Sequence, residues 1–277
     1  LMSKSLVLHG ISVAETLNQN TATQLAVLSV PVNLCAVVAG QDPMLMRFVK
    51  AKQKAAQRVG MQFSVYQFEE GQEAAAGVTL DFLASDEEAQ GVFVELPLPQ
   101  GWETERLLAR IPTSKDVDVL TRAHEDLFYS GDSSALLPPA VGAFKALAEA
   151  YAIALPGTRV AVVGMGRLVG KPLAHWLRKQ GAVVEEITID TPNPEQVTRS
   201  CGLVIAAAGV PGLIKADWLA PQAIVVDYGF HVTDTGVVGD VDPEAYKNAG
   251  AYTPVPGGMG PLVVAAVLEN TLTLALR

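Results

Sequence analysis

The sequence of 277 residues is poor in cysteine and histidine, with two of the former and four of the latter. Cys35 and Cys201 each lie in or beside an apolar strand pattern, and their spacing matches neither a metal site nor a redox pair. We therefore expect both to be buried, unpaired thiols in a reducing compartment. The histidines are scattered and form no ligand motif, so no metal site is expected.

Long apolar runs and blocks of basic residues are also missing. No apolar run reaches the roughly 18 residues that a membrane-spanning helix requires, and the first residues lack the apolar region and cleavage site of a signal peptide. The formal net charge is −9 at pH 7 without any cluster of lysine or arginine, which argues against a nucleic-acid partner. These absences favour a cytoplasmic protein with neither a membrane nor a nucleic-acid partner.

Apolar strand patterns alternate with helical patterns along most of the chain. Most of the apolar runs lack polar alternation, so they suit strands covered on both faces, as in a parallel sheet flanked by helices. The expected strands are 34–39, 63–68, 91–94, 160–163, 182–187, 203–208 and 223–227. The expected helices are 43–59, 72–84, 142–151, 170–179 and 262–276. The sequence therefore predicts an α/β fold.

The chain is long enough for two domains, each with its own core. Residues 115–137 are irregular and polar, and we expect them to cross between the domains. We place the first domain at 1–122 plus 262–277, because the last helix is expected to return to it. The second domain, at 123–261, is expected to be Rossmann-like, with a parallel sheet.

A glycine-rich turn between a strand and a helix indicates a dinucleotide site. Gly164 permits the tight turn, Gly166 lets the backbone approach a pyrophosphate, and Gly170 lets the helix pack closely on the strand. The N–H groups at the start of that helix would face the phosphates. The alternative is a glycine turn that only packs a helix on a sheet.

Charged residues in three segments could carry chemistry. Helix 43–59 places Phe48 and Lys52 on one face, and its lysines either form a solvated basic face or turn one member inward as an acid, a base or an anchor. Glu95 follows a strand, at the end where open α/β sheets place ligands, or it is a charge at a loop edge. Asp118 lies on a loop with a second carboxylate, where capping a turn is the alternative role.

Residues 254–261 contain three glycines and three prolines in eight positions. Such a segment has little backbone freedom. A flat ligand stacked against the backbone would use that shape, and a rigid hinge is the alternative.

These segments resemble the bifunctional 5,10-methylenetetrahydrofolate dehydrogenase/methenyltetrahydrofolate cyclohydrolase family over nearly the whole chain. The matching motifs are Phe48-x-x-x-Lys52-x-Lys54, Glu95 to Pro99, Lys115 to Asp118, Val169 to Pro172, Gly239 to Asp242, Pro254 to Pro261 and Leu268 to Thr271. The resemblance implies two α/β domains with a cleft between them, usually as a homodimer. Folate would lie in the cleft, and NAD or NADP on the Rossmann-like domain.

The resemblance also implies roles for individual residues. The catalytic lysine falls on Lys52, with Glu95 at a neighbouring motif position, and Asp118 would bond the pterin ring. The implied substrate-binding residues are Phe48, Pro256, Gly257 and Gly258. The implied reaction transfers a hydride from the folate methylene carbon to a nicotinamide, giving methenyltetrahydrofolate, whose hydrolysis would give 10-formyltetrahydrofolate.

Several positions depart from the family's pattern. They are Phe48 for tyrosine, Met44-Leu45 for Ala-Ser, Glu95 for glutamine, Leu137 to Ala140 for Pro-Cys-Thr-Pro, Met165-Gly166 for Arg-Ser, Thr188-Ile189 for His-Ser and Val263 for threonine. Two other interpretations therefore stay open, a catalytically impaired folate-binding paralogue with a regulatory role and an unrelated Rossmann-type dehydrogenase.

Two departures support physical hypotheses. We expect Glu95 to lie near Lys52, where a carboxylate beside an ammonium favours the charged form of both. A lysine held as a cation is a poorer base, so cyclohydrolase activity is expected to be weak or absent.

The second hypothesis concerns the dinucleotide. Neither Met165 nor Ile189 can bind the 2′-phosphate of NADP. Asp190, 20 residues after Gly170, occupies about the position from which an acid bonds the ribose 2′-OH of NAD. NAD is therefore favoured over NADP, unless Asp190 merely caps the following turn.

Overall fold

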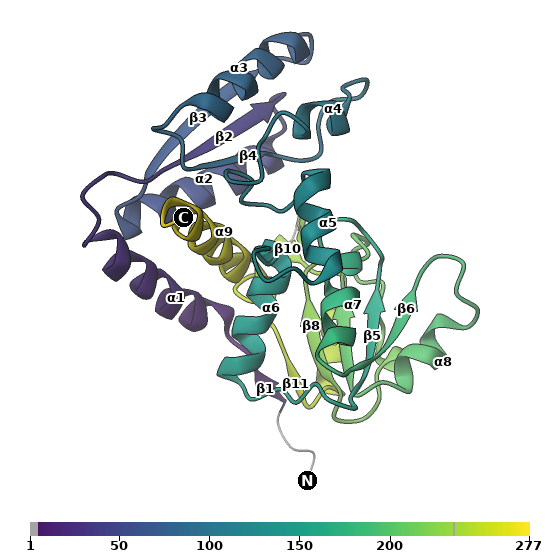
Figure 1. The fold of residues 1–277 in the computed structure, drawn as a ribbon. Helices are drawn as coiled ribbons and strands as arrows, with labels where there is room; N and C mark the ends of the chain where they lie inside the picture. The colour runs from purple at the N-terminus through teal and green to yellow at the C-terminus, as the bar shows by residue number, and fades with distance from the viewer. Residues whose placement is uncertain (1–4, 235) are drawn as a thin grey trace. The chain divides into compact units, whose positions relative to one another are not determined.

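The computed structural model describes residues 5–234 and 236–277, which divide into two compact units. The six-stranded unit joins the N-terminal segment up to Ala14 to Ala140–Val263. The three-stranded unit joins Glu15–Pro139 to Val264–Arg277. Helices α1 (Gly10–Leu25) and α9 (Met259–Ala275), which are labelled in Figure 1, each contain a boundary between the units.

The three-stranded unit is built on a parallel sheet in the order β3-β2-β4. The central strand β2 is buried at every residue after Asn33, which explains why its sequence is a continuous apolar run. Its strands are β2 (Asn33–Ala39), β3 (Gln62–Phe68) and β4 (Gly91–Val94). Its further helices are α2 (Pro43–Val59), α3 (Glu73–Ser85), α4 (Thr104–Leu108) and α5 (Arg122–Ser130).

Local signals set both ends of α2, the helix that carries the predicted catalytic lysine. The Asp42 side chain accepts a hydrogen bond from the Met44 N–H at 2.7 Å, and Pro43 occupies the first turn, where its missing N–H costs nothing. Gly60 ends the helix with φ of +84°, a left-handed conformation that glycine adopts readily. These caps fix where the helix begins and ends.

The six-stranded unit contains an entirely parallel sheet in the order β1-β11-β8-β7-β5-β6. Its strands are β1 (Leu6–Val7), β5 (Arg159–Val163), β6 (Val183–Ile187), β7 (Leu203–Ala206), β8 (Ile224–Asp227) and β11 (Ala251–Tyr252). Its helices are α6 (Pro139–Ala150), α7 (Gly170–Lys179), α8 (Pro194–Arg199) and the 3₁₀ turns η1 (Ala216–Trp218) and η2 (Pro243–Lys247). A two-stranded antiparallel hairpin, β9 (His231–Thr233) with β10 (Gly236–Val238), follows β8.

Each unit has its own apolar core, as expected for two α/β domains. One core surrounds β2 and β4, and the other surrounds β5, β7 and β8. The units divide the chain at residues other than the domain boundaries expected from the sequence: residues 123–139 belong to the three-stranded unit, and the segment up to Ala14 to the six-stranded unit. The assignment of folate binding to 1–122 plus 262–277 and of dinucleotide binding to 123–261 remains a prediction.

The expectation that residues 115–137 are irregular is wrong for part of that segment. Helix α5 lies within it, because Thr121 accepts a hydrogen bond from the His124 N–H at 3.3 Å and Gly131 ends the helix with φ of +79°. These are ordinary capping signals, and the polar composition of the segment hid them. Helix α1 and the β9–β10 hairpin were also not anticipated.

Two further expectations concern cysteine and the membrane. Cys35 and Cys201 are both buried and free, as predicted. No helix among the described residues is long and apolar enough to span a bilayer.

Candidate active site

Helix α2 directs Lys52 inward. Its buried face is formed by Leu45, Val49, Ala56 and Val59. The side chain of Lys52 lies on that face and is only 12% exposed, whereas Lys50 and Lys54 are exposed. The sequence left open whether these lysines form a solvated basic face or turn one member inward. In the structure, Lys52 is the lysine that turns inward.

Lys52 and Glu95 form a nearly buried ion pair. The Lys52 Nζ lies 2.6 Å from the Glu95 Oε2, and the Glu95 side chain is 7% exposed. Glu95 follows β4 directly, and its backbone N–H donates to the carbonyl of Val37 on β2. The Lys52 Nζ also lies 4.6 Å from the ring centroid of Phe93, a favourable cation–π distance. The expected proximity of Glu95 and Lys52 is confirmed.

Asp118 belongs to the same electrostatic cluster. The pKa of its carboxyl group is raised to about 7, mainly by burial; Lys52 lowers it, and the negative charges of Glu95 and Asp116 raise it. No hydrogen bond to this carboxylate occurs within residues 5–234 and 236–277, so Asp118 does not cap a turn. It offers an acceptor to a ligand.

The neighbouring Asp116 has the structural role that the sequence left open for this loop. Its carboxylate accepts hydrogen bonds from the backbone of Thr121 at 2.8 Å and Leu120 at 3.3 Å. His124 places its Nδ1 3.4 Å from the Asp116 Oδ2, and its Nε2 accepts a hydrogen bond from the Leu136 N–H. Although burial raises the pKa of Asp116, these hydrogen bonds lower it below the ordinary value. Asp116 thus shapes the loop that presents Asp118.

The loop holding Asp118 is conformationally unusual. Val119 has a φ of +56°, a left-handed conformation that β-branched residues rarely adopt. Such strain persists only where surrounding contacts enforce it. Val119 is 2% exposed, and the Asp116 hydrogen bonds to the next two residues hold the turn. The strain therefore accompanies the carboxylate predicted to bind the substrate.

The proline- and glycine-rich loop lies in the six-stranded unit and is braced rather than free. The carbonyl of Gly257, whose φ is +101°, accepts the N–H groups of Gly10 and Ile11 at 3.0 and 3.3 Å. A Cβ on Gly258 would lie 2.5 Å from the Pro254 carbonyl oxygen. The loop is thus a fixed surface, and α9 begins at Met259. That Pro256, Gly257 and Gly258 line a substrate site remains a prediction.

Packing explains two of the three glycines in the turn after β5. Gly164 has a φ of +96°, and a Cβ there would lie 2.4 Å from the Ala207 carbonyl oxygen. A Cβ on Gly170 would lie 1.9 Å from the Gly164 carbonyl oxygen. Gly166 differs, because a Cβ there would meet nothing within 4 Å. Gly166 precedes the ten-residue helix α7, and its approach to a pyrophosphate remains a prediction.

Asp190 lies just beyond the carboxyl end of β6. The turn around it is capped by threonines: the Thr191 hydroxyl accepts the Thr188 N–H at 2.8 Å, and the Thr188 hydroxyl accepts the Asp190 N–H at 3.3 Å. The Asp190 carboxylate caps nothing among the described residues. It is exposed, and the adjacent Ile189 is 100% exposed. The capping role that the sequence allowed for Asp190 is therefore not observed.

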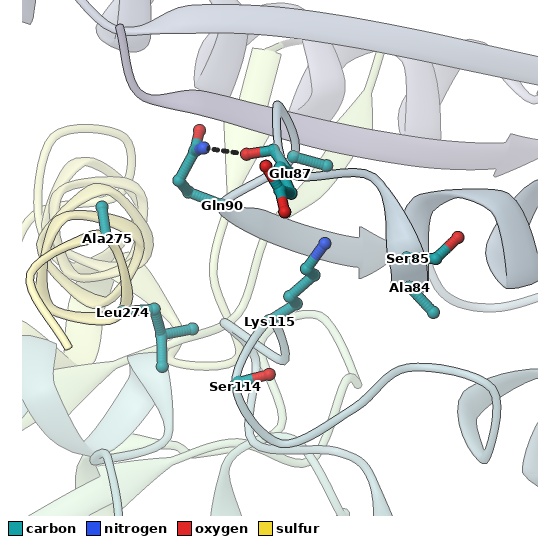
Figure 2. A pocket seen from close by; sticks show the side chains of 9 residues that line it. Ala84, Ser85, Glu87, Gln90, Ser114, Lys115, Leu274 and Ala275 are labelled. Atoms are coloured by element: carbon teal, nitrogen blue, oxygen red, sulfur yellow. Dashed lines mark hydrogen bonds between the residues drawn. The ribbon is translucent and has the colours of Figure 1, made fainter. Parts of the chain in front are cut away.

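A hollow elsewhere in the three-stranded unit is not part of this cluster. Figure 2 shows Lys115, Gln90 and Glu87 at its rim, near the amino end of β4, whereas Glu95 follows the carboxyl end. Lys115 donates to the carbonyl of Leu83 at 2.8 Å and so satisfies the end of α3. No group of three or more metal-binding side chains occurs in the part of the chain that the structure describes.

Comparisons with known proteins identify the family. The model described as tetrahydrofolate dehydrogenase/cyclohydrolase, catalytic domain, matches residues 8–118, and that of its NAD(P)-binding domain matches 138–277. A bifunctional protein FolD of Thermus thermophilus is 36% identical over 271 residues, covering 98% of this chain and 96% of that protein. The chain belongs to the tetrahydrofolate dehydrogenase/cyclohydrolase family.

Solved structures of the tetrahydrofolate dehydrogenase/cyclohydrolase family share this fold. The bifunctional FolD methylenetetrahydrofolate dehydrogenase/cyclohydrolase of Campylobacter jejuni has a TM-score of 0.94 and 31% identity, with 98% of this chain and 99% of that chain covered. The FolD of Trypanosoma brucei, complexed with NADP and an inhibitor, has a TM-score of 0.94 and 28% identity, with 100% of both chains covered.

The two family models divide the predicted site residues between them. The catalytic-domain model of the tetrahydrofolate dehydrogenase/cyclohydrolase family covers Lys52, Glu95 and Asp118, and the NAD(P)-binding model covers the glycine turn, Asp190 and the loop at 254–261. Sequence analysis overlooked the contact of His124 with Asp116. The polar composition of the segment around His124 gave no signal for it.

Proposed function

We propose that this protein oxidises 5,10-methylenetetrahydrofolate to 5,10-methenyltetrahydrofolate with NAD as the preferred hydride acceptor. The observation that supports this most is the cluster of Lys52, Glu95 and Asp118 within the catalytic domain of the family. A bound NAD would supply the nicotinamide carbon that accepts the hydride. The described residues supply the binding and the orientation.

Asp118 is proposed to bind the pterin ring. An ionised carboxylate can accept two parallel N–H donors, which the amino-pyrimidine edge of a pterin presents. Phe48, four residues before Lys52, would stack on the folate without the hydroxyl of a tyrosine. The braced loop with Pro256, Gly257 and Gly258 would line the pterin. Lys52 would stand close to the one-carbon unit as a fixed positive charge.

The Lys52–Glu95 pair limits the second reaction of the family. Hydrolysis of the methenyl product needs a group that helps water attack the methenyl carbon. A lysine whose Nζ lies 2.6 Å from a carboxylate oxygen, with both side chains nearly buried, directs a donor to that carboxylate rather than to an attacking water. Cyclohydrolase activity is therefore proposed to be weak or absent. A purely folate-binding paralogue would lack dehydrogenase activity as well.

The Gly166→Ala variant tests the dinucleotide site. Because a Cβ at Gly166 meets no protein atom, the stability should stay within about 0.5 kcal/mol of the parent. The added methyl group would block a pyrophosphate, so the dissociation constant for NAD should rise at least about tenfold. Gly202→Ala is the matched control, because Gly202 also has open space around it. Unchanged NAD binding by Gly166→Ala would show that the pyrophosphate does not bind at this turn.

Asp190 is proposed to select NAD. Its exposed carboxylate can accept the ribose 2′-OH and repels a 2′-phosphate, and Met165 and Ile189 offer that phosphate no donor. Replacing Asp190 by serine should shift the ratio of NADP to NAD affinity toward NADP by about tenfold to a hundredfold. Fluorescence titration with both dinucleotides measures this, with the exposed Asp217→Ser as control. Tighter binding of NADP than of NAD by the unmodified protein would contradict the proposal.

A homodimer in the cytoplasm completes the proposed assignment. The reducing cytoplasm suits two buried free cysteines, and sedimentation of the purified chain would measure its oligomeric state.

The function is tested by incubating the protein with 5,10-methylenetetrahydrofolate and each dinucleotide. When NAD is the dinucleotide, the absorbance of the reduced nicotinamide and that of the methenyl product should rise together. Little further conversion to 10-formyltetrahydrofolate is expected. Folate binding without either product would instead support the impaired paralogue. Absence of folate binding would support an unrelated dehydrogenase.

A further inference from the structure

A buried aspartate–histidine pair lies beyond the carboxyl end of β8, and none of the roles assigned above uses it. The His231 Nε2 lies 2.8 Å from the Asp240 Oδ1. The Asp240 side chain is 0% exposed, whereas that of His231 is 22% exposed. The other oxygen of Asp240 accepts the Gly209 N–H at 2.8 Å. One buried carboxylate thus holds both His231 and the loop that follows β7.

Asp227 holds this pair in place. Its Oδ1 accepts the N–H groups of Gly229 at 2.7 Å and Asp240 at 3.1 Å. Its Oδ2 accepts the Val241 N–H and the Tyr246 hydroxyl, both at 3.0 Å. Each of these hydrogen bonds is accepted by a buried carboxylate. Together they hold the segments around His231 and Asp240 in a single arrangement. His231 is a partly exposed member of a polar network centred on the two buried carboxylates of Asp227 and Asp240.

The order of the strands places this pair on the nicotinamide side of the sheet. The glycine turn follows β5, which lies between β6 and β7. A dinucleotide crossing such a turn directs its adenosine ribose toward the β6 end, where Asp190 lies, and its other half toward the β7 and β8 ends. The loop after β7 contacts both the glycine turn and Asp240. A Cβ on Gly164 would touch Ala207 and Ala208 of this loop, and the N–H of the next residue, Gly209, donates to Asp240.

We propose that His231, oriented by Asp240, lies against the nicotinamide half of the dinucleotide and sets the relative affinity for its oxidised and reduced forms. The nicotinamide ring carries a positive charge only when oxidised. The Asp240 carboxylate with a neutral His231 attracts that charge, and protonation of His231 cancels the attraction. The inference rests on the proposed use of a dinucleotide, and it adds a residue that distinguishes NAD⁺ from NADH.

Other charged groups around His231 also contribute to the electrostatic attraction for the nicotinamide charge. Asp227 and the Tyr246 hydroxyl lie on the far side of Asp240. Lys215 and Asp242 form their own exposed ion pair at 2.8 Å, and Asp234 is exposed in the hairpin. Residues 207–212 of the loop after β7 contain no ionisable side chain. Histidine is the side chain that ordinarily changes charge between about pH 5 and pH 8, and the proposal is therefore tested across that range.

The test is a titration of the whole protein with NAD⁺ and with NADH separately, from about pH 6 to pH 8. In the unmodified protein the preference for NAD⁺ over NADH should rise about tenfold across this range. In His231→Asn the preference should not change with pH. The matched control is His175→Asn, which removes another histidine of the same unit, on α7.

Three results would overturn the inference. They are a pH-independent preference in the unmodified protein, a pH-dependent preference retained in His231→Asn, and loss of the pH dependence in the control. Binding of neither dinucleotide would overturn the proposed function as well. Binding of both without a pH effect would overturn only the role of His231. Circular dichroism of each variant separates these results from misfolding.

Discussion

Replacing Glu95 by glutamine should raise the hydrolysis of 5,10-methenyltetrahydrofolate by about tenfold to a hundredfold. Glu95 engages the Lys52 Nζ through a contact of 2.6 Å between nearly buried side chains. Glutamine has a similar size but no charge, so it releases Lys52 from the ion pair to assist the attacking water. The loss of methenyl absorbance, corrected for the buffer-catalysed reaction, measures the effect.

Two variants complete this experiment. Glu103→Gln removes a carboxylate from an exposed ion pair with Arg106 in the same unit and should leave hydrolysis unchanged. Lys52→Met, introduced together with Glu95→Gln, should remove the gain. If Glu95→Gln gains nothing while remaining folded, the ion pair is not what limits the cyclohydrolase step. Hydrolysis by the unmodified protein well above the buffer rate would lead to the same conclusion.

Replacing Asp118 by asparagine should weaken binding of the folate substrate by about a hundredfold. Two charge-assisted hydrogen bonds to the pterin contribute roughly 3 kcal/mol in total, and a neutral amide offers only one acceptor in their place. Calorimetric titration with tetrahydrofolate measures the change. Asp126→Asn on α5 is the control, because Asp126 is exposed and pairs with the exposed Arg122.

The same carboxyl group predicts a pH dependence of folate binding. Its pKa is raised to about 7, mainly by burial, so roughly one-tenth of the molecules carry the carboxylate at pH 6 and nine-tenths at pH 8. Folate affinity of the unmodified protein should therefore rise about ninefold over this range, and that of Asp118→Asn should not. A pH-independent affinity of the unmodified protein would exclude Asp118 as the ionised pterin acceptor.

Stability changes in the opposite direction, which separates weak binding from misfolding. Because the pKa of Asp118 is higher in the folded chain than in the unfolded chain, folding favours the protonated form, and stability is lost as the pH rises from about 4 to about 7. Asp118→Asn cannot ionise and escapes this loss. At pH 8 the variant should bind folate more weakly and yet unfold at a higher denaturant concentration than the unmodified protein.

Apolar patterning predicted the strands of the three-stranded sheet and β5 to β8 of the six-stranded sheet, but it missed β1 and β11, which have two residues each. Strands such as β2 and β7 are buried at nearly every residue, so their sequences are uninterrupted apolar runs. The proximity of Lys52 and Glu95 was predictable because both belong to motifs of one family. The α5 helix was missed because its signals, Thr121 and Gly131, are capping residues within a polar segment.

The supporting polar networks could not be derived from the sequence. Asp116 with His124 and Asp240 with His231 each join a loop residue to a residue of a separate helix or strand, and only the folded chain shows that they are in contact. The motif at 239–242 pointed to Asp240 without indicating its partner. Burial of a polar side chain depends on segments distant in sequence, which periodicity does not report.

The most direct test of this account is to follow deuterium from the folate. Folate carrying deuterium at the methylene carbon is incubated with the protein and NAD⁺, and the reduced dinucleotide is analysed by mass spectrometry. The account predicts one deuterium per molecule of reduced dinucleotide, formed together with the methenyl product. Reduced dinucleotide without deuterium, or no reduction at all in a folded protein that binds NAD⁺, would contradict it.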